Sequence, residues 1–150
     1  MKELLKGHIY LDIKGDTKDE ILKEIVFKVK ELGNEGMKKK VLSLIKERES
    51  ASSTGLGFGV AIPHIRSELV ENILIYAFRA KKEIEYNSID GYPVRLLFLV
   101  LIPQRFNKSA SIILSSIVDT LRSEELRKKL LLAKNEKEFL NIIVDKRFEV

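Results

Sequence analysis

Cysteine and tryptophan are absent from this sequence, which contains only two methionines and two histidines. Without cysteine the chain can form neither a disulfide framework nor a thiolate metal site. The histidines, His8 and His64, are far apart in the sequence, and neither belongs to a cluster with metal-ligand spacing. The sequence therefore predicts no metal site and no cofactor.

Long apolar runs are also missing. Residues 1–16 lack the continuous apolar core of a secretory signal peptide. The longest apolar run, residues 94–103, contains Arg95 and is too short to span a bilayer. We therefore expect a cytoplasmic protein with no direct membrane insertion.

No stretch rich in proline, glycine and serine divides the chain, and no internal repeat is visible. A length of 150 residues is usual for one compact domain, and 45% hydrophobic with 33% charged residues is typical of a globular protein. We predict a single domain over residues 1–150.

The charge balance is mildly basic, because 27 lysines and arginines against 22 acidic residues give a formal net charge of +5. Such a balance suits a nucleic acid, an anionic ligand or an acidic protein partner. The basic run at residues 38–40 lies within a predicted helix and is interpreted as solvated surface. Basic and aromatic residues are not interleaved, so no nucleic-acid partner is expected.

Hydrophobic periodicity predicts helices towards both ends of the chain and strands between them. Apolar residues at helical spacing predict helices over residues 15–33, 37–50, 110–121, 123–133 and 135–144. Apolar runs predict strands at 9–13, 59–63, 72–80 and 94–103, the last covered on both faces. This order predicts an α/β (α+β) fold, a single domain with a mixed central β-sheet flanked by helices.

The segment STGLGFGVAIPHIR, residues 53–66, contains three closely spaced glycines. These glycines follow a helix and lead into a strand, the reverse of a dinucleotide fingerprint, and no lysine follows Gly59 as in a P-loop. They predict a sharp loop with positive φ angles. Such a loop can also bring backbone N–H groups close to an anion.

His64 follows Pro63 at the end of the predicted strand. Pro63 lacks a backbone donor and has a fixed φ, so the imidazole projects from a rigid point. A lone histidine in such a place is more often structural, but Arg48, Arg66 and the hydroxyls of residues 52–54 are close to it in sequence. A nucleophilic imidazole among such donors is suited to a phosphoryl group.

The segment ERESASSTGLGFGVAIPHIR, residues 47–66, resembles the signature of the enzyme IIA domains of the bacterial phosphoenolpyruvate-dependent phosphotransferase system, fructose/mannitol/nitrogen class. In that family an Arg-Glu pair precedes Ser-Thr-Gly-hydrophobe-Gly, which is followed by Gly-hydrophobe-Ala-hydrophobe-Pro-His. The separation of Arg48 and His64 agrees with this pattern. The predicted strand at 94–103 and the C-terminal helices also match, so the resemblance covers nearly the whole chain.

The resemblance implies a phosphohistidine carrier with a mixed sheet flanked by helices. His64 corresponds to the family's phosphorylated histidine and Arg48 to the arginine that pairs with phosphoryl oxygens, with Thr54 beside the imidazole. The group is expected to come from the carrier protein HPr and to pass to an enzyme IIB partner. Further residues are expected to bind the phosphoryl group or these partners: Ser53, Gly55, Gly57, Phe58, Ile65 and Arg66.

Two details remain open at this point. Phe58 and Ile65 are candidates for an apolar docking rim, with burial of either as the alternative. The second histidine that family members usually carry is replaced by Ala110, which leaves Ser109 or Ser111 as neighbouring hydroxyl donors. Three functions stay possible: a carrier in sugar uptake, a nitrogen-type regulator that signals through its phosphorylation state, and an interaction module that transfers nothing.

Overall fold

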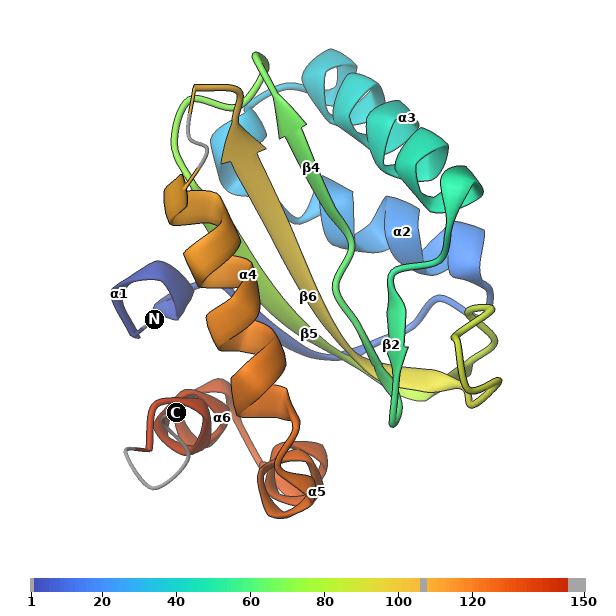
Figure 1. Cartoon of the computed structure of the whole chain (residues 1–150), viewed down its shortest axis with the longest axis vertical. Coiled ribbons are helices and arrows are strands. Elements are labelled where there is room, and N and C mark those ends of the chain that lie inside the picture. Colours follow the sequence, from blue (N-terminus) through green and yellow to red (C-terminus); the bar gives the residue numbers. More distant parts are fainter. Residues whose placement is uncertain (1, 106–107, 146–150) are drawn as a thin grey trace.

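The computed structural model describes residues 2–105 and 108–145, which form a six-stranded mixed sheet with helices on both faces (Figure 1). The strands are β1 (Ile9–Ile13), β2 (Gly55–Gly57), β3 (Val60–Ala61), β4 (His64–Ser67), β5 (Leu74–Ile84) and β6 (Val94–Pro103). The helices are α1 (Lys2–Leu5), α2 (Lys18–Phe27), the 3-10 helix η1 (Lys30–Leu32), α3 (Glu35–Ala51), α4 (Lys108–Leu121), α5 (Glu124–Leu132) and α6 (Glu136–Ile143).

The sheet order is β1-β5-β6-β3-β2, and β4 also pairs with β6. Strand β6 is central, antiparallel to β5 and parallel to β3 and β4. Helices α2 and α3 cover one face, while α4, α5 and α6 cover the other (Figure 1). The predicted fold class is confirmed, and so is the prediction that residues 94–103 form a central strand covered on both faces.

The helices begin where capping side chains occur. Thr17, Asn34, Ser123 and Asn135 each accept a hydrogen bond from a backbone N–H in the first turn of α2, α3, α5 and α6. Such caps satisfy donors that the helix itself leaves without partners. Among residues 2–105 and 108–145, no helix combines the length and the apolar character needed to cross a bilayer.

Strands β3 and β4 lie end to end along the same edge of β6. Val60 is opposite Leu96 and His64 is opposite Val100, so both strands keep one register offset. The interruption lies at Ile62 and Pro63, where proline has no N–H to pair. The strand predicted over residues 59–63 is confirmed as the shorter β3, which ends at Ala61, but the prediction missed that pairing resumes at His64, which opens β4.

His8, the other histidine, lies just before β1 and contacts residues of β5 and η1 through its side chain. Its Nδ1 lies 3.1 Å from the Ile75 carbonyl oxygen, and its Nε2 lies 2.7 Å from a Glu31 carboxylate oxygen. Its ring stacks on Tyr76 with the centroids 3.9 Å apart, and the Tyr76 hydroxyl donates to Glu31. These contacts account for His8 by packing and hydrogen bonding within the fold.

Glu31 makes the stability of this corner depend on pH. Burial alone would raise the pKa of Glu31, but donation by Tyr76 and His8 outweighs burial and leaves that pKa below its ordinary value. A carboxylate with a depressed folded pKa stabilises the protein above its unfolded pKa and loses this effect as the pH falls through the folded pKa. Because the Glu31 side chain is 38% exposed and solvent screens its charge, Glu31→Gln is expected to lower the free energy of unfolding at pH 7 by about 0.5–1 kcal/mol.

This deficit should shrink as the pH falls through the lowered pKa of Glu31, where the carboxylate of the wild-type protein becomes protonated. Urea unfolding at pH 7 and pH 3 measures it. Glu83→Gln, at an exposed site on β5, is the matched control and should show little deficit at either pH. A deficit in Glu31→Gln that is equal at both pH values would contradict this account.

Candidate functional site

The imidazole of His64 is partly buried and held by one hydrogen bond. Its Nδ1 lies 2.7 Å from the carbonyl oxygen of Ile62. A carbonyl oxygen can only accept, so Nδ1 carries a proton, and in the neutral form of the ring the lone pair is then on Nε2. Because Pro63 stands between the two residues and fixes its own φ, the backbone holds this pose. This pose leaves Nε2 as the ring nitrogen that is not used in the bond to Ile62.

The side of the sheet that His64 faces follows from strand alternation. Val60 and Ile62 belong to the core beneath α4, α5 and α6, whereas Ala61 and Ile65 belong to the core beneath α2 and α3. His64 is two residues beyond Ile62, so its side chain lies on the α4 face. In the described part of the chain, β4 pairs with β6 along one edge, and no strand pairs with its other edge.

Arg48 reaches the same edge from the opposite face. It lies in the last turn of α3, where its guanidinium donates to the Ser52 carbonyl oxygen at 2.9 Å. A surface hollow beside β4 is lined by Leu44, Glu47, Arg48, Ala51, Ile65 and Arg66. The hydrogen bonds described for residues 2–105 and 108–145 include none between Arg48 and His64. The structure brings two cations to the strand that begins at His64, in keeping with an anion-binding edge.

The glycine segment forms the β2–β3 hairpin, whose backbone N–H groups already have acceptors within the chain. The N–H of Thr54 donates to Glu49, that of Gly55 to the Ser53 hydroxyl, and that of Phe58 to Asp90. The expectation that loop amides face an anion is therefore wrong for these three groups. This hairpin is held by its own side chains instead.

Two glycines of the hairpin are required by close packing. A Cβ atom on Gly55 would lie 2.4 Å from the Ser88 hydroxyl oxygen and 3.0 Å from its Cα. Gly57 has φ +99°, and a Cβ there would lie 2.9 Å from an Asp90 carboxylate oxygen. Both glycines are buried, and their close packing against Ser88 and Asp90 shapes the hairpin. Their part in binding stays a prediction of the resemblance.

Thr54 is also buried, with 5% of its surface exposed. Its hydroxyl donates to Glu49 and lies 3.2 Å from the Tyr86 hydroxyl, so it does not stand free beside the imidazole. Ser53 is held in the same way, since its hydroxyl donates to the Tyr86 carbonyl oxygen at 3.0 Å. The structure links Thr54 to His64 only through Ile62, whose N–H donates to the Thr54 carbonyl oxygen at 3.1 Å.

Glu49 is a site residue that the reasoning from sequence missed. It is buried in α3, and its carboxylate accepts from Thr54, Tyr86 and Lys18. A signal was present, because Glu49 lies four residues after the buried Ile45 and so falls on the inner face of the helix. A carboxylate at such a position needs partners, which the sequence alone did not identify.

The position assigned to the missing second histidine is buried. Ala110 is 1% exposed and packs in the core between α4 and the sheet, on the face of His64. Ser109 and Ser111 are exposed in the first turns of α4. Ile65, a candidate for the docking rim, is 7% exposed, so the alternative of burial holds for it.

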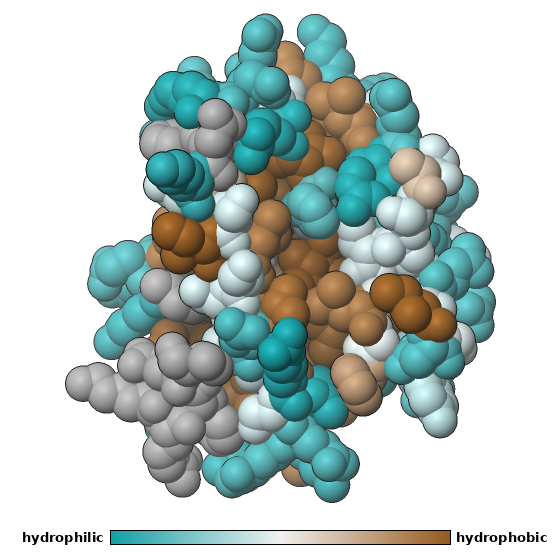
Figure 2. Space-filling view, in the orientation of Figure 1, coloured by the Kyte–Doolittle hydropathy of each residue, from teal (hydrophilic) through white to brown (hydrophobic). Residues whose placement is uncertain are grey.

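Phe58 is exposed at the tip of the hairpin, with 70% of its surface accessible. It borders a hollow of about 210 Å³ between the hairpin and α4, lined by Leu56, Gly57, Phe58, Val60, Val118, Leu121 and Arg122. Hydrophobic residues gather in the middle of this face and are bordered by hydrophilic ones (Figure 2). Val60 is on the same face as His64, four residues away, so the hollow and the imidazole share one surface.

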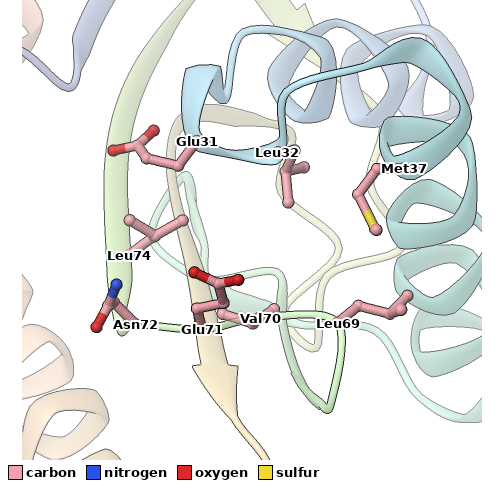
Figure 3. Close-up of a pocket in the computed structure, with 8 residues that line it drawn as sticks. All are labelled: Glu31, Leu32, Met37, Leu69, Val70, Glu71, Asn72 and Leu74. Carbon is pink, nitrogen blue, oxygen red and sulfur yellow. The ribbon is translucent and has the colours of Figure 1, made fainter.

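Another hollow, of about 200 Å³, lies between η1, the start of α3 and the loop before β5 (Figure 3). Glu31 lies at its edge and the Glu71 side chain points into it, over an apolar lining that includes Leu32, Leu69 and Met37. Two carboxylates would repel a phosphoryl group. The described part of the chain has no group of three or more acidic or histidine side chains placed to hold a metal ion.

Comparison with known proteins agrees with this arrangement. Residues 3–146 match the family model for the phosphoenolpyruvate-dependent sugar phosphotransferase system, EIIA 2. The chain belongs to this family. Members of the family act as phosphoryl carriers.

Relatives of two kinds match the chain. It is 36% identical over 142 residues to the PTS system fructose-specific EIIABC component of Bacillus subtilis, covering 94% of this chain but only 22% of that protein. It is 31% identical over 104 residues to the fructose-specific EIIA component of Haloferax volcanii, covering 69% of this chain and 68% of that protein. A nitrogen regulatory protein of Bradyrhizobium diazoefficiens is 30% identical over 131 residues, covering 87% of this chain and 85% of that protein.

Solved structures share the fold. The nitrogen regulatory protein IIA-Ntr of Neisseria meningitidis superposes with a TM-score of 0.89 at 28% identity, covering 95% of this chain and 98% of that one. The IIA mannitol protein of Escherichia coli superposes with a TM-score of 0.73 at 19% identity, covering 93% and 97%. These likenesses agree with the single mixed sheet and its flanking helices described above.

Proposed function

We propose that this domain accepts a phosphoryl group on Nε2 of His64 from a phosphohistidine of an HPr-type carrier and passes it to an enzyme IIB partner. The observation that carries this proposal is the Nδ1 hydrogen bond to the Ile62 carbonyl, which leaves Nε2 as the nucleophile. The complex of enzyme IIAMTL with phosphorylated enzyme IIBMTL, a structure of the same fold, supports the choice of acceptor.

In the transfer, the Nε2 lone pair attacks phosphorus in line with the donor nitrogen. A new N–P bond forms on His64 as the donor's N–P bond breaks, and that electron pair returns to the donor imidazole. Negative charge is spread over the three equatorial oxygens in the transition state. Arg48 and Arg66 are proposed to stabilise this charge, and their shared lining of the hollow beside β4 supports this assignment.

Incubation with phosphorylated HPr, followed by intact mass measurement, tests the proposal. The mass should rise by one phosphoryl group at neutral pH, and the gain should be lost in acid because a phosphohistidine is acid-labile. A regulatory function is the second candidate, favoured by the likeness to nitrogen regulatory proteins over most of their length. Onward transfer to a IIB domain supports the sugar-uptake carrier, whereas stable phosphorylation without transfer supports the regulator.

Phe58 is proposed to contribute to docking of the carrier protein. Exposed aromatic side chains beside an apolar hollow are typical of residues that anchor a protein partner. Phe58→Ala is expected to raise the KM for phosphorylated HPr roughly 10-fold while leaving the unfolding midpoint nearly unchanged. Steady-state phosphorylation rates at varied HPr concentration measure the effect.

The matched control for Phe58 is Leu132→Ala, which removes another exposed apolar side chain, at the end of α5. It should leave the KM unchanged. An unchanged KM in Phe58→Ala would place the docking surface elsewhere.

A further inference from the structure

The carboxylate of Glu49 is buried and fully occupied by donors. The residue is 7% exposed, and its oxygens accept from the Thr54 N–H at 3.1 Å and from the Tyr86 hydroxyl at 2.9 Å. The Thr54 hydroxyl also donates to it, and Lys18 Nζ lies 2.9 Å away. These donors come from the start of α2, the residues after β5 and the loop after α3. One carboxylate therefore joins three separate parts of the chain.

This carboxylate is ionised in the folded protein. Burial alone would raise the pKa of Glu49, but the hydrogen bonds from Thr54, Lys18 and Tyr86 outweigh burial and hold that pKa below its ordinary value. Hydrogen bonds to a buried charge are stronger than those between neutral groups. The segment at Thr54 is thus held more firmly than a neutral side chain would hold it.

A continuous chain of hydrogen bonds leads from Glu49 to His64. Glu49 holds Thr54 by both its N–H and its hydroxyl. The Thr54 carbonyl oxygen accepts from the Ile62 N–H at 3.1 Å. The carbonyl oxygen of Ile62 then accepts from His64 Nδ1 at 2.7 Å. The position of the acceptor that fixes the imidazole therefore depends on where Glu49 holds Thr54.

We propose that Glu49 is a positioning residue for His64, which it acts on through Thr54 and Ile62 to keep Nδ1 protonated and Nε2 available for phosphoryl transfer. The importance of Glu49 for phosphoryl transfer rests on the proposed function, whereas the hydrogen bonds that join it to His64 do not. The contacts described for residues 2–105 and 108–145 join the Glu49 carboxylate to Thr54, Tyr86 and Lys18, and none joins it to the imidazole. It sets the direction of the Ile62 carbonyl, and that carbonyl selects the tautomer.

The neighbouring residue on α3 holds the other end of the same short loop. Arg48 donates to the Ser52 carbonyl oxygen, while Glu49 binds Thr54 two residues later. One residue pair at the end of α3 thus fixes both ends of the turn that leads into the hairpin. The Arg-Glu pair therefore has two separate tasks, charge stabilisation by Arg48 and positioning by Glu49.

Glu49→Gln tests the proposal, because the amide keeps the size of the side chain but offers one acceptor oxygen in place of two. At least one of the donors around it then loses its partner. Protein labelled with 15N-histidine is examined by two-bond proton–nitrogen correlation spectra, which distinguish the two imidazole tautomers. The wild-type protein should show only the Nδ1–H tautomer for His64, and Glu49→Gln should show a mixture. Phosphorylation by phosphorylated HPr should slow roughly 10-fold to 100-fold.

Tyr86→Phe is the matched control. It removes one donor to Glu49 and destabilises the same cluster, but both hydrogen bonds from Thr54 to Glu49 remain possible. Its His64 spectrum should match that of the wild-type protein even if its unfolding midpoint falls as far as that of Glu49→Gln. A wild-type His64 spectrum in Glu49→Gln, or the same mixture in both variants, would overturn the proposal.

Thr54→Val covers the case in which Glu49→Gln does not fold. Valine keeps the shape and the backbone groups of Thr54 and removes only the hydroxyl bond to Glu49, so a smaller tautomer shift is expected. An unshifted His64 spectrum in a folded Thr54→Val protein would then count against the proposal. The spectra need no phosphoryl donor. If wild-type protein accepts no phosphoryl group, the proposed function fails while the spectra still decide the positioning by Glu49.

Discussion

Replacing His64 by alanine is expected to abolish phosphoryl acceptance from phosphorylated HPr. His64 is partly buried at the start of β4, and the hydrogen bond described for its ring is made by Nδ1, whereas both nitrogens of His8 are engaged by Ile75 and Glu31. His64→Ala removes the imidazole that the proposed function requires as the nucleophile. Intact mass after incubation with phosphorylated HPr should show the gain of one phosphoryl group in the wild-type protein and none in the variant.

His8→Ala is the matched control for that experiment. It removes the other imidazole and should destabilise the start of β1, yet the folded protein should still gain one phosphoryl group. A phosphorylated His64→Ala variant would contradict the assignment of the nucleophile. No gain in any of the proteins, even after long incubation, would identify the domain as an interaction module that transfers nothing.

Arg48→Gln is expected to slow phosphoryl gain by roughly 10²-fold, with a smaller change in KM. The guanidinium lines the hollow beside β4, and the proposed function assigns it to stabilising charge on the equatorial oxygens. A group that acts mainly in the transition state affects the rate constant more than substrate binding. Rapid-quench measurement of phosphorylation at saturating donor gives the rate constant directly.

Arg48→Lys should recover part of the rate, because it keeps the charge and loses only the forked donor geometry. Lys46→Gln removes a charge from an exposed position on the same helix and should leave the rate unchanged. Equal effects of Arg48→Gln and Lys46→Gln would show that Arg48 acts only through the overall charge. That outcome would remove it from the site.

Most of the fold could be predicted from sequence patterns because its long elements have clear periodicity. Strand β6 was predicted with the same bounds, residues 94–103, since ten nearly continuous apolar residues suit a strand buried on both faces. The helices predicted over residues 123–133 and 135–144 are confirmed as α5 and α6, which Ser123 and Asn135 cap. The helix predicted over residues 15–33 was too long.

The helix α2 ends at Phe27 because the chain tightens there. The N–H groups of Lys28 and Val29 bond to carbonyls three residues back, and η1 follows at Lys30–Leu32. Short strands were missed for a different reason. Strand β2 consists of Gly-Leu-Gly, which has little strand propensity, and it forms only because β3 pairs with it.

The candidate site could be predicted where the residues lie in one segment. His64 and Arg48 are close in sequence, and the structure places them at one strand edge from opposite faces. Lys18 and Tyr86 come from distant parts of the chain, and no local pattern indicates that both donate to Glu49. The Phe58 amide is not available to an anion because Asp90, another distant residue, accepts from it.

The central claim is that the phosphoryl group resides on Nε2 of His64. It is tested most directly by nitrogen correlation spectra of protein labelled with 15N-histidine, recorded before and after phosphorylation by phosphorylated HPr. With only two histidines in the chain, each ring can be assigned by replacing the other. The account predicts that the His64 Nε2 resonance alone gains coupling to phosphorus, while Nδ1 stays protonated and His8 is unchanged. Phosphorus on Nδ1 of His64, or on His8, would contradict it.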